Sequence, residues 1–539
     1  MKKILLGNDA IIEGALASGV SFVSGYPGCP SAEIGDNFGK IAAKNGVYAE
    51  WSTNEKTAME AAIGASFSGL KSLVNMKSFG INVCSDSLLP LAYTGTKGAM
   101  VIVVADDPSC WSSAQTEQNS RAYSAFGHIP TLEPSDPQEC YDFTKLAFEI
   151  SEKFNTPVML HTTTRVNHQK MPVEFEPVAI NGEFKKGEFI KNPHQFSTMP
   201  PRTLEMKAEL LEKIKEIKQF AEKSKVNFVA GKKESKIGVV TSGASYLHVK
   251  EALLALDLDL PVLKLGFFYP LPDNKILNFI KKNKKILVVE ELDPYLEKEI
   301  NVLAKKANQK IEIYGKNVLT EIGELNVEKV TVALAKVTGK KFTSFKFKPM
   351  ILPKRTARLC EGCPYWYVFP VLKRIAPDAI FGGDIGCNMI ANLAPHNLTD
   401  YMFAMGAGIG ISHGVSKSTT QKVITIMGDG TFFHSGIAGL VNAVYNKSNP
   451  LVVILDNRIT AMTGHQPNPG MGKTLMKEDT KELSIEEIVK ACGVENIKVL
   501  DPINIQEFEG TIKDFLEKKE ISVIICKRIC ALLAKRQAK

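Results

Sequence analysis

Short, continuous apolar runs alternate along the chain with longer Ala/Gly-rich or amphipathic stretches. In the first third, residues 20–28, 72–76 and 99–108 are such runs, and residues 55–70 form one of the stretches between them. Continuous apolar runs are typical of strands buried on both faces of a parallel sheet, and the longer stretches are typical of the helices that cover it. The pattern therefore predicts an α/β fold.

The same alternation divides the chain into three blocks and a connector. Residues 171–235 lack a sustained period apart from a charged amphipathic helix at 202–225, and we interpret them as the connector. In the last block, apolar runs occur at residues 379–387, 422–430 and 451–457. We predict three domains, each built on a parallel sheet, at residues 1–170, 236–345 and 346–539.

Composition is that of an ordinary globular protein and excludes few functions. The chain has 539 residues, of which 44% are hydrophobic, and this is enough for several buried cores. The net charge of +8 is modest, and the lysines are spread along helical faces, which argues against nucleic-acid binding. Asn8 and Asp9 interrupt the first apolar patch before a signal sequence or membrane span could form, so we expect a cytoplasmic protein without a membrane anchor.

Polar side chains follow two apolar runs of the last block. Asp429 stands between Gly428 and Gly430 after one run, and Asn457 follows the next run, 28 residues later. This spacing suits one strand–helix–strand unit, which brings both oxygen ligands to the same sheet edge. With the backbone carbonyl of Ile459, they would leave room around Mg²⁺ for diphosphate oxygens, so we predict a diphosphate anchor.

Six of the ten cysteines lie in the last third of the chain. Cys360 and Cys363 form a C-x₂-C pair, and Cys387 follows 24 residues later. Structural zinc, a redox dithiol and an iron–sulfur cluster all use this spacing, which does not choose among them.

Residues 428–470 resemble the thiamine diphosphate-binding stretch of 2-oxoacid:ferredoxin oxidoreductases, and within them the alpha subunits of indolepyruvate ferredoxin oxidoreductases. Further matches fall in order along the whole chain at residues 25–34, 50–66, 106–108, 117–121, 162–168, 359–364 and 382–387. The resemblance implies a pyrimidine-binding domain first, a transketolase C-terminal-like domain second and a diphosphate-binding domain third.

The resemblance also implies roles for residues of the first domain. Glu55 matches the glutamate that hydrogen-bonds the aminopyrimidine ring and so activates thiamine. It could instead be a helix N-terminal carboxylate beside a capping Thr53 or Asn54, and Glu60 is the rival acid. Cys29 stands where relatives usually have the threonine that binds the substrate carboxylate. A thiol is a weaker donor, so Ser31 and nearby backbone N–H groups could take over.

In the third domain, the resemblance favours a [4Fe–4S] cluster held by Cys360, Cys363, Cys387 and a fourth cysteine. We predict Cys530 as that ligand, with Cys526 as the alternative. His434 could be an acid/base group near thiamine or a polar residue satisfied at a helix start. His465 could face the cofactor.

The function implied is oxidative decarboxylation of an aryl 2-oxoacid such as indolepyruvate, with coenzyme A taking the acyl group and electrons passing to ferredoxin. A small beta subunit equivalent to the superfamily's gamma domain is not found, so we expect a heteromeric assembly. The C-terminal ferredoxin-like segment of typical alpha subunits is also not found, and distal electron transfer would need another polypeptide or direct docking of ferredoxin. A non-oxidative thiamine-dependent decarboxylase or synthase would not need the cysteines, and a non-catalytic scaffold would not bind the cofactor.

Overall fold

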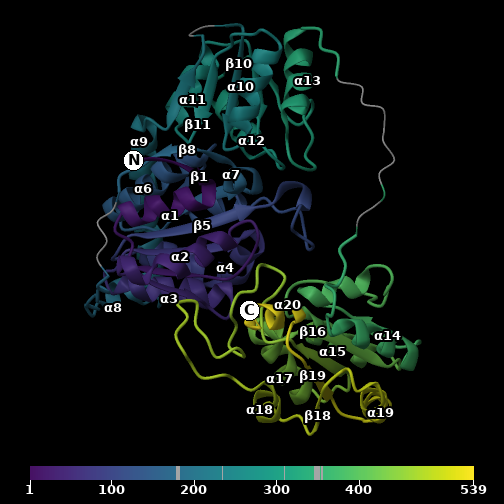
Figure 1. The fold of residues 1–539 in the computed structure, drawn as a ribbon. Coiled ribbons are helices and arrows are strands. Elements are labelled where there is room, and N and C mark those ends of the chain that lie inside the picture. The colour runs from purple at the N-terminus through teal and green to yellow at the C-terminus, as the bar shows by residue number, and fades with distance from the viewer. Residues whose placement is uncertain (178–181, 233–234, 309, 345–352, 354–355, 539) are drawn as a thin grey trace. The chain divides into compact units, whose positions relative to one another are not determined.

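The computed structural model describes residues 1–177, 182–232, 235–308, 310–344, 353 and 356–538. It divides into two compact units, Met1–Lys348 and Pro349–Lys539. The α/β class predicted from the apolar runs is confirmed, because the strands form sheets covered by helices (Figure 1).

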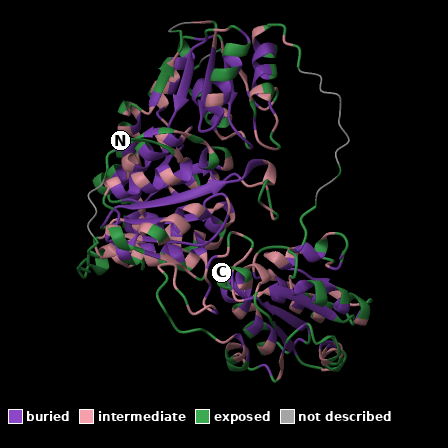
Figure 2. Cartoon of the chain, viewed as in Figure 1, coloured by how far each residue is buried: buried purple, intermediate pink, exposed green. Residues whose placement is uncertain are grey.

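The first sheet of unit 1 is built almost wholly from the first block of the chain. Within the described residues it has seven strands in the order β12-β6-β7-β5-β4-β2-β3. Their bounds are β2 Phe22–Gly25, β3 Tyr48–Trp51, β4 Ser72–Lys77, β5 Met100–Asp106, β6 Thr131–Leu132, β7 Val158–Thr163 and β12 Phe267–Tyr269. Every residue of β5 is buried, as expected for a central strand covered on both faces (Figure 2).

Helices cover both faces of this sheet. They are α1 Gly7–Ala17, α2 Ala32–Ile41, α3 Glu55–Phe67, α4 Ser78–Thr94, α5 Ala122–Gly127, α6 Pro137–Phe154 and α7 Thr164–His168, with 3₁₀ turns at Ala43–Asn45 and Pro108–Cys110. In Figure 1, α1 and α6 lie on one side of β5, and α3 and α4 lie on the other. Alternate residues of β5 pack against α3 and α4: Met100, Ile102 and Val104 share a core with Ala62 and Leu88.

The connector contributes more structure than its irregular sequence indicates. Its elements are β8 Lys170–Glu174, α8 Pro193–Phe196, α9 Arg202–Lys223 and β9 Asn227–Ala230. The long helix α9 confirms the amphipathic pattern, with Met206, Leu210, Ile217 and Ala221 buried. Strand β8 pairs antiparallel with β1, Lys2–Leu6.

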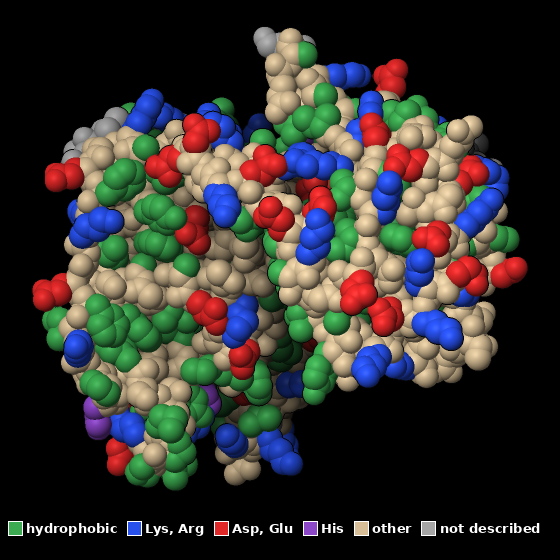
Figure 3. Space-filling model, turned by 90° about the horizontal axis from the view of Figure 1, so that it is seen from below, with side chains coloured by type: hydrophobic (Ala, Val, Ile, Leu, Met, Phe, Trp, Pro, Cys, Tyr) green, Lys and Arg blue, Asp and Glu red, His purple; other side chains and the backbone are tan. Residues whose placement is uncertain are grey.

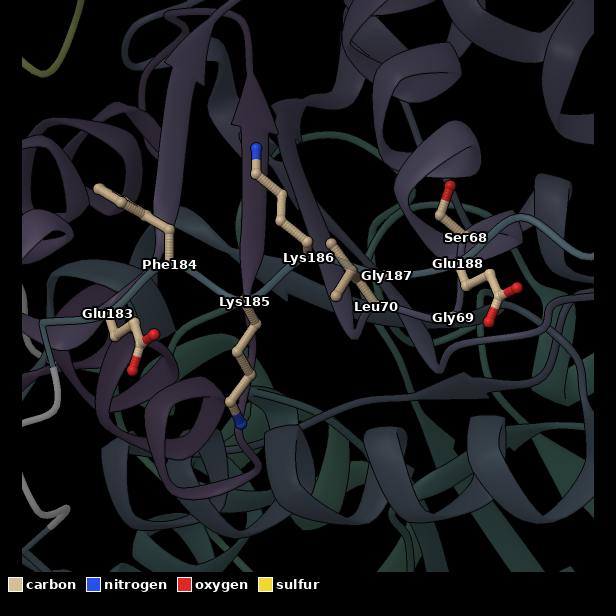
Figure 4. A pocket seen from close by; sticks show the side chains of 9 residues that line it. All are labelled: Ser68, Gly69, Leu70, Glu183, Phe184, Lys185, Lys186, Gly187 and Glu188. Atoms are coloured by element: carbon tan, nitrogen blue, oxygen red, sulfur yellow. The ribbon is translucent and has the colours of Figure 1, made fainter.

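A surface depression of about 730 Å³ lies where the connector crosses the end of α3 (Figure 4). Residues 183–188 run past Ser68–Leu70, and the side chains of Lys185 and Lys186 point to opposite sides. Gly187 lies so close to the Ser68 carbonyl oxygen that a Cβ there would stand 2.0 Å from it. None of the predicted site residues lines this depression.

The second block of unit 1 forms its own sheet. In the described residues, five strands follow the order β14-β13-β10-β11-β9. Besides β9 from the connector, the sheet and its helices comprise β10 Ile237–Ser242, α10 Ser245–Ala255, β11 Val262–Leu265, α11 Asp273–Lys281, β13 Lys285–Val289, α12 Tyr295–Lys306, β14 Glu312–Tyr314 and α13 Val327–Thr338. One core lies between this sheet and α10 with α13, and another lies between the sheet and α11 with α12.

Two edge strands of unit 1 pair antiparallel with sheets whose other strands are parallel. Strand β12 belongs to the second block by sequence, yet it pairs antiparallel with β6 of the first sheet. Strand β9 belongs to the connector and pairs antiparallel with β11 of the second sheet. Both are short edge strands whose long-range pairing no local pattern encodes.

Unit 2 holds a wholly parallel sheet. Over the part of the chain that is described, its order is β15-β16-β17-β19-β18. The elements are α14 Tyr365–Ile375, β15 Ile380–Gly382, a 3₁₀ turn Cys387–Asn392, α15 Ala407–Ser418, β16 Val423–Gly428, α16 Asp429–Thr431, a π-helical turn Phe432–Gly436, α17 Ile437–Tyr445, β17 Leu451–Asp456, α18 Ile485–Ala491, β18 Asn496–Leu500, α19 Ile505–Leu516, β19 Ser522–Lys527 and α20 Ala531–Gln537. Helices α14 and α19 cover one face, and α15, α17 and α18 cover the other.

The surface shows mixed charge. On the face in Figure 3, Lys and Arg side chains are interspersed with Asp and Glu. Among the described residues, no helix combines the length and apolar character that a membrane span requires.

Candidate functional site

The Gly-Asp-Gly turn lies where strand β16 passes into helix α16. Asp429 is the first residue of that helix and is buried. Its Oδ1 accepts a hydrogen bond from Gly430 N at 2.8 Å, and its Oδ2 accepts one from Asn468 Nδ2 at 3.0 Å. Gly430 leaves room for the following loop, because a Cβ there would stand 2.9 Å from Thr460 Oγ1. A carboxylate is therefore held at the carboxyl end of β16, as the spacing predicts.

Asn457 occupies the neighbouring strand end, directly after β17. Its Oδ1 accepts a hydrogen bond from Ile459 N at 3.1 Å, and its Nδ2 donates to Tyr365 Oη at 2.9 Å. Strands β16 and β17 are parallel neighbours, with Gly428 opposite Leu455. The two predicted oxygen ligands thus reach the same edge of the sheet.

Burial disfavours the charged forms of the two carboxyl groups at this edge. Burial, and secondarily the nearby Asp456, raise the pKa of Asp429 to about 7. Burial also raises the pKa of Asp456. Asn388 Oδ1 is buried near Gly428 and has no hydrogen-bond partner among the described residues. The desolvated Asp429 carboxylate and the unpaired Asn388 amide oxygen are hard oxygen ligands, so these residues fit Mg²⁺.

Four cysteines surround one cavity of about 220 Å³ in unit 2. Cys360, Cys363, Cys387 and Cys530 all line it, together with Tyr365, Asn457 and His465 among others. The diphosphate edge and the cysteine cavity are therefore adjacent, because Asn457 and Tyr365 belong to both.

Three segments bring the cysteines together. Cys360 and Cys363 lie on a tight turn, in which Cys363 N donates to the Cys360 carbonyl at 3.1 Å. Gly362 in that turn has φ +75° and approaches Ala531, to which a Cβ would come within 3.6 Å. Cys530 N donates to the Asn457 carbonyl at 3.1 Å, which places the residue beside the end of β17.

The expectation that Cys387 ends its strand is wrong. Strand β15 stops at Gly382, and Cys387 begins the 3₁₀ turn that follows. The alternative ligand Cys526 lies inside β19, and its side chain is buried in the core under α14 and α19. Cys530 lies beyond the strand at the start of α20, so the structure brings Cys530 rather than Cys526 to the cavity.

The thiols influence one another electrostatically. Burial, with the nearby Cys363, Cys530 and Cys360, raises the pKa of Cys387 to about 12. Burial likewise raises the pKa of Cys363 to about 11. In the described part of the chain, no group of three or more His, Cys, Asp or Glu is arranged so that it could hold a metal ion. Four thiols around one cavity nevertheless fit a cubane cluster in the chemistry of their donor atoms.

The two histidines lie in different places. His434 is buried in the π-helical turn, and its Nδ1 lies 2.7 Å from Ser435 Oγ. Burial raises the pKa of the nearby Asp384 carboxyl to about 6, and His434 offsets part of that rise. His465 lines the cysteine cavity, where its Nε2 is 3.9 Å from Cys530 Sγ.

In unit 1, Glu55 begins helix α3 and is buried. Asn54 caps that helix by accepting a hydrogen bond from Thr57 N at 2.9 Å, so the capping part of the alternative is also present. Gly80 of α4 makes room for the glutamate, because a Cβ there would stand 2.6 Å from Glu55 Cγ. Glu60 is 48% exposed and pairs with Lys56 at 3.0 Å, as a surface residue would.

The loop between β2 and α2 carries the predicted substrate residues. Cys29 is half-buried, and burial together with the Glu33 carboxylate raises its pKa. Ser31 is fully buried, and its Oγ donates to the Gly28 carbonyl at 3.2 Å. Lys77, at the end of the adjacent strand β4, lies against Gly28: a Cβ there would come within 3.1 Å of Lys77 Cβ.

Several residues at these sites escaped the sequence reasoning. Asn468 bonds Asp429, Tyr365 bonds Asn457, and Lys77 stands beside Cys29 in charge range of its thiol. Tyr365 directly follows the C-x₂-C-Pro segment, and this adjacency could have identified it. Neither Asn468 nor Lys77 belongs to a spacing that carries such a signal.

Comparison with protein families covers nearly the whole chain. Residues 13–226 match the family model "Pyruvate flavodoxin/ferredoxin oxidoreductase, thiamine diP-bdg", residues 227–349 match "Indolepyruvate oxidoreductase domain", and residues 384–526 match "Thiamine pyrophosphate enzyme, C-terminal TPP binding domain". These matches define a thiamine diphosphate-binding oxidoreductase class.

Individual relatives identify the family more narrowly than the family models do. The indolepyruvate oxidoreductase subunit IorA of Methanothermobacter thermautotrophicus is 42% identical over an alignment that covers 98% of this chain and 87% of that protein. IorA of Pyrococcus horikoshii is 40% identical, over 98% of this chain and 86% of that protein. The chain belongs to the family of the indolepyruvate oxidoreductase subunit IorA, which confirms the predicted family and enzyme class.

A solved structure shows the same fold. The 2-oxoglutarate:ferredoxin oxidoreductase from Magnetococcus marinus, with 2-oxoglutarate, coenzyme A and succinyl-CoA bound, aligns with a TM-score of 0.51 and 18% identity. The alignment covers 62% of this chain and 65% of that one. The predicted thiamine-binding α/β fold is thus confirmed, while the domain boundaries and the roles of individual residues stay predictions.

Proposed function

We propose that this chain, with a partner subunit, catalyses the oxidative decarboxylation of an aryl 2-oxoacid such as indolepyruvate to the acyl-CoA and CO₂, with electrons passing to ferredoxin. The names of its relatives support the substrate and the oxidoreductase class. The single structural observation that carries the oxidative reaction is the placement of four cysteines around a cavity adjacent to the predicted diphosphate anchor.

In this proposal, Asp429, Asn457 and the carbonyl of Ile459 hold Mg²⁺, and Gly428 and Gly430 admit the diphosphate. Asp429 suits the role because its buried carboxylate has no cationic side chain bonded to it in the described structure. Glu55 holds a carboxylate for the aminopyrimidine ring, His434 is the candidate for proton movement, and His465 faces the cofactor. When bound, thiamine diphosphate supplies a nucleophilic carbon and an electron sink, and a [4Fe–4S] cluster supplies one-electron acceptance.

Cys360, Cys363, Cys387 and Cys530 would hold the cluster through their thiolates. Asn457 lines the same cavity as these cysteines, and Cys530 N donates to its carbonyl at 3.1 Å. A short path from the thiamine site to an electron acceptor is what an oxidative reaction needs and a non-oxidative decarboxylase does not. The small beta subunit, ferredoxin and coenzyme A belong to the same proposal as partners and co-substrate.

An oxygen-free preparation of the chain, co-expressed with its partner subunit, tests this function. We expect iron and acid-labile sulfide near four of each per chain, and ferredoxin reduction that depends on both an aryl 2-oxoacid and coenzyme A. Cys363→Ala should lose cluster and ferredoxin reduction while keeping thiamine diphosphate binding. Cys526→Ala is the matched control and should keep the cluster, because its side chain lies in the core.

Two results would contradict the proposal. Zinc in place of iron would favour a structural site. Release of CO₂ and an aldehyde without coenzyme A or ferredoxin would favour the non-oxidative decarboxylase.

A further inference from the structure

Strand β4 of unit 1 ends in a half-buried cation. Lys77 is its last residue and lies at the same sheet edge as the ends of β2 and β5, because all three strands are parallel neighbours. That edge also carries the Gly28–Cys29 loop and Asp107. The electrostatic neighbours of the Lys77 ammonium include Cys29 and Glu55, so it stands near both the predicted substrate loop and the predicted thiamine-activating acid.

The partners of this ammonium group are neutral. Lys77 Nζ donates to the Ser112 carbonyl at 3.1 Å and to Ser113 Oγ at 2.9 Å, and the Phe79 ring lies 4.9 Å away. An ammonium has three N–H donors, so one has no oxygen acceptor among the described residues. No carboxylate in the described structure forms an ion pair with Lys77.

Asp107, the first of the charged neighbours of Lys77, is committed elsewhere. Its Oδ2 accepts hydrogen bonds from Ser112 N and Ser113 Oγ, both at 2.7 Å, and its Oδ1 accepts one from Thr164 Oγ1 at 2.6 Å. Burial lowers the pKa of Lys77 despite this neighbour, so the charged form lacks a full counter-ion. An added carboxylate would satisfy both the third donor and the charge.

We propose that Lys77 binds the carboxylate of the 2-oxoacid substrate. Cys29 has no hydroxyl for this role, and the hydroxyl of Ser31 is buried and bonded to the Gly28 carbonyl. The inference rests on the proposed function and names the residue that recognises the substrate's acid group. The aliphatic stem of Lys77 lies against Gly28: a Cβ on Gly28 would come within 3.1–3.2 Å of Lys77 Cβ, Cγ and Cδ, so the loop lies directly beside the Lys77 side chain.

The competing role for Lys77 is structural, since its two hydrogen bonds tether the 112–113 loop. Lys77→Gln separates the two roles, because the amide keeps N–H donors for the tether and removes the charge. Lys77→Met removes both. Lys71→Met is the matched control: Lys71 directly precedes β4, at the opposite end of the same strand, and pairs with Glu152 on the surface at 3.0 Å.

The measurement uses the chain assembled with its partner subunit and loaded with thiamine diphosphate. Inhibition constants are compared for 3-phenylpropanoate and its neutral amide 3-phenylpropanamide, with phenylpyruvate oxidation as the reporting reaction. Lys77→Gln should raise the KM for phenylpyruvate and the inhibition constant of the carboxylate by about 10- to 100-fold. The constant for the amide and the affinity for thiamine diphosphate should change less than about twofold, and Lys71→Met should match the parent.

Equal weakening of carboxylate and amide would overturn the inference and leave Lys77 a structural tether. Unchanged constants for both would overturn it as well. If Lys77→Gln fails to fold, Lys77→Arg must retain the preference for the carboxylate over the amide. If the parent oxidises no 2-oxoacid, the proposed function has failed, and direct titration with the two probes still tests whether Lys77 selects the carboxylate.

Discussion

The hydroxyl of Tyr365 links the predicted diphosphate anchor to the cysteine cavity, and its removal has a defined consequence. Tyr365 is buried, and its Oη accepts the hydrogen bond from Asn457 Nδ2 at 2.9 Å. That bond fixes which end of the Asn457 amide faces the tyrosine, and so leaves Oδ1 for Ile459 N and for a cation. Tyr365→Phe keeps the ring in the core but leaves a buried amide donor without a partner.

The magnitude follows from that unpaired donor. Leaving one buried polar group unsatisfied costs about 1–3 kcal/mol, whereas the net value of an ordinary hydrogen bond is about 1 kcal/mol. We therefore expect the opening free energy of unit 2 to fall by about 1–3 kcal/mol. Where the Asn457 amide turns to find another partner, cofactor binding must turn it back, so the Kd for Mg²⁺–thiamine diphosphate should rise about tenfold.

Hydrogen exchange of the β16 and β17 amides reports the opening of this unit alone. Cofactor affinity is measured separately by calorimetric titration. Tyr445→Phe is the control, because that tyrosine is 82% exposed and its substitution should stay within about 0.5 kcal/mol. In an Asn457→Ala background, Tyr365→Phe should lose most of its effect, since the donor it served is gone.

The reasoning is refuted if Tyr365→Phe lowers the opening free energy of unit 2 equally in the parent and in the Asn457→Ala background. The tyrosine would then act through core packing and not through the amide. Unchanged exchange and unchanged affinity in the single variant would refute it more simply.

Three further predictions concern single carboxylates. Asp429→Ala should abolish tight Mg²⁺–thiamine diphosphate binding, seen by titration, while circular dichroism stays that of the parent, because the site loses its one predicted carboxylate ligand. Glu55→Gln should keep cofactor binding but slow exchange of the thiamine C2 proton, followed by NMR; an unchanged rate would move the role to Glu60. Burial raises the pKa of Glu291 to about 7, above its usual 4.5, so the protonated form favours folding below pH 4.5 and this stability, about 3 kcal/mol, disappears as pH rises to 7. Denaturant titrations of Glu291→Gln across this range should lack that loss.

The sequence predicts the central strands well, because burial on both faces demands continuous apolar side chains. The continuous apolar runs at β5, β16 and β17 therefore predict buried strands. The antiparallel pairings of the edge strands β9 and β12 could not be predicted, since each strand has only three or four residues and no local pattern specifies its partner. Cys387 was misplaced for a related reason: the strand before it is only three residues long.

The site residues also differ in how well the sequence predicts them. Asp429 and Asn457 are one strand–helix–strand unit apart, and such local geometry is readable from spacing. The partners that orient or surround these functional groups cannot be predicted from spacing. Tyr365 meets Asn457 across 92 positions, and Lys77 meets Ser112 and Ser113 across 35 and 36 positions. Only the packed chain brings these pairs together.

The antiparallel edge strand β12 has a consequence for the order in which the molecule is made. It completes the first sheet by pairing with β6, yet about 100 residues separate it from β7. At roughly 5–20 residues per second, a ribosome needs on the order of 5–20 s to synthesise that interval. During this time the outer side of β6 is an uncovered sheet edge, which can pair with other chains. Correct maturation of the first domain therefore waits for the second, and a nascent chain halted between them carries a surface prone to aggregation.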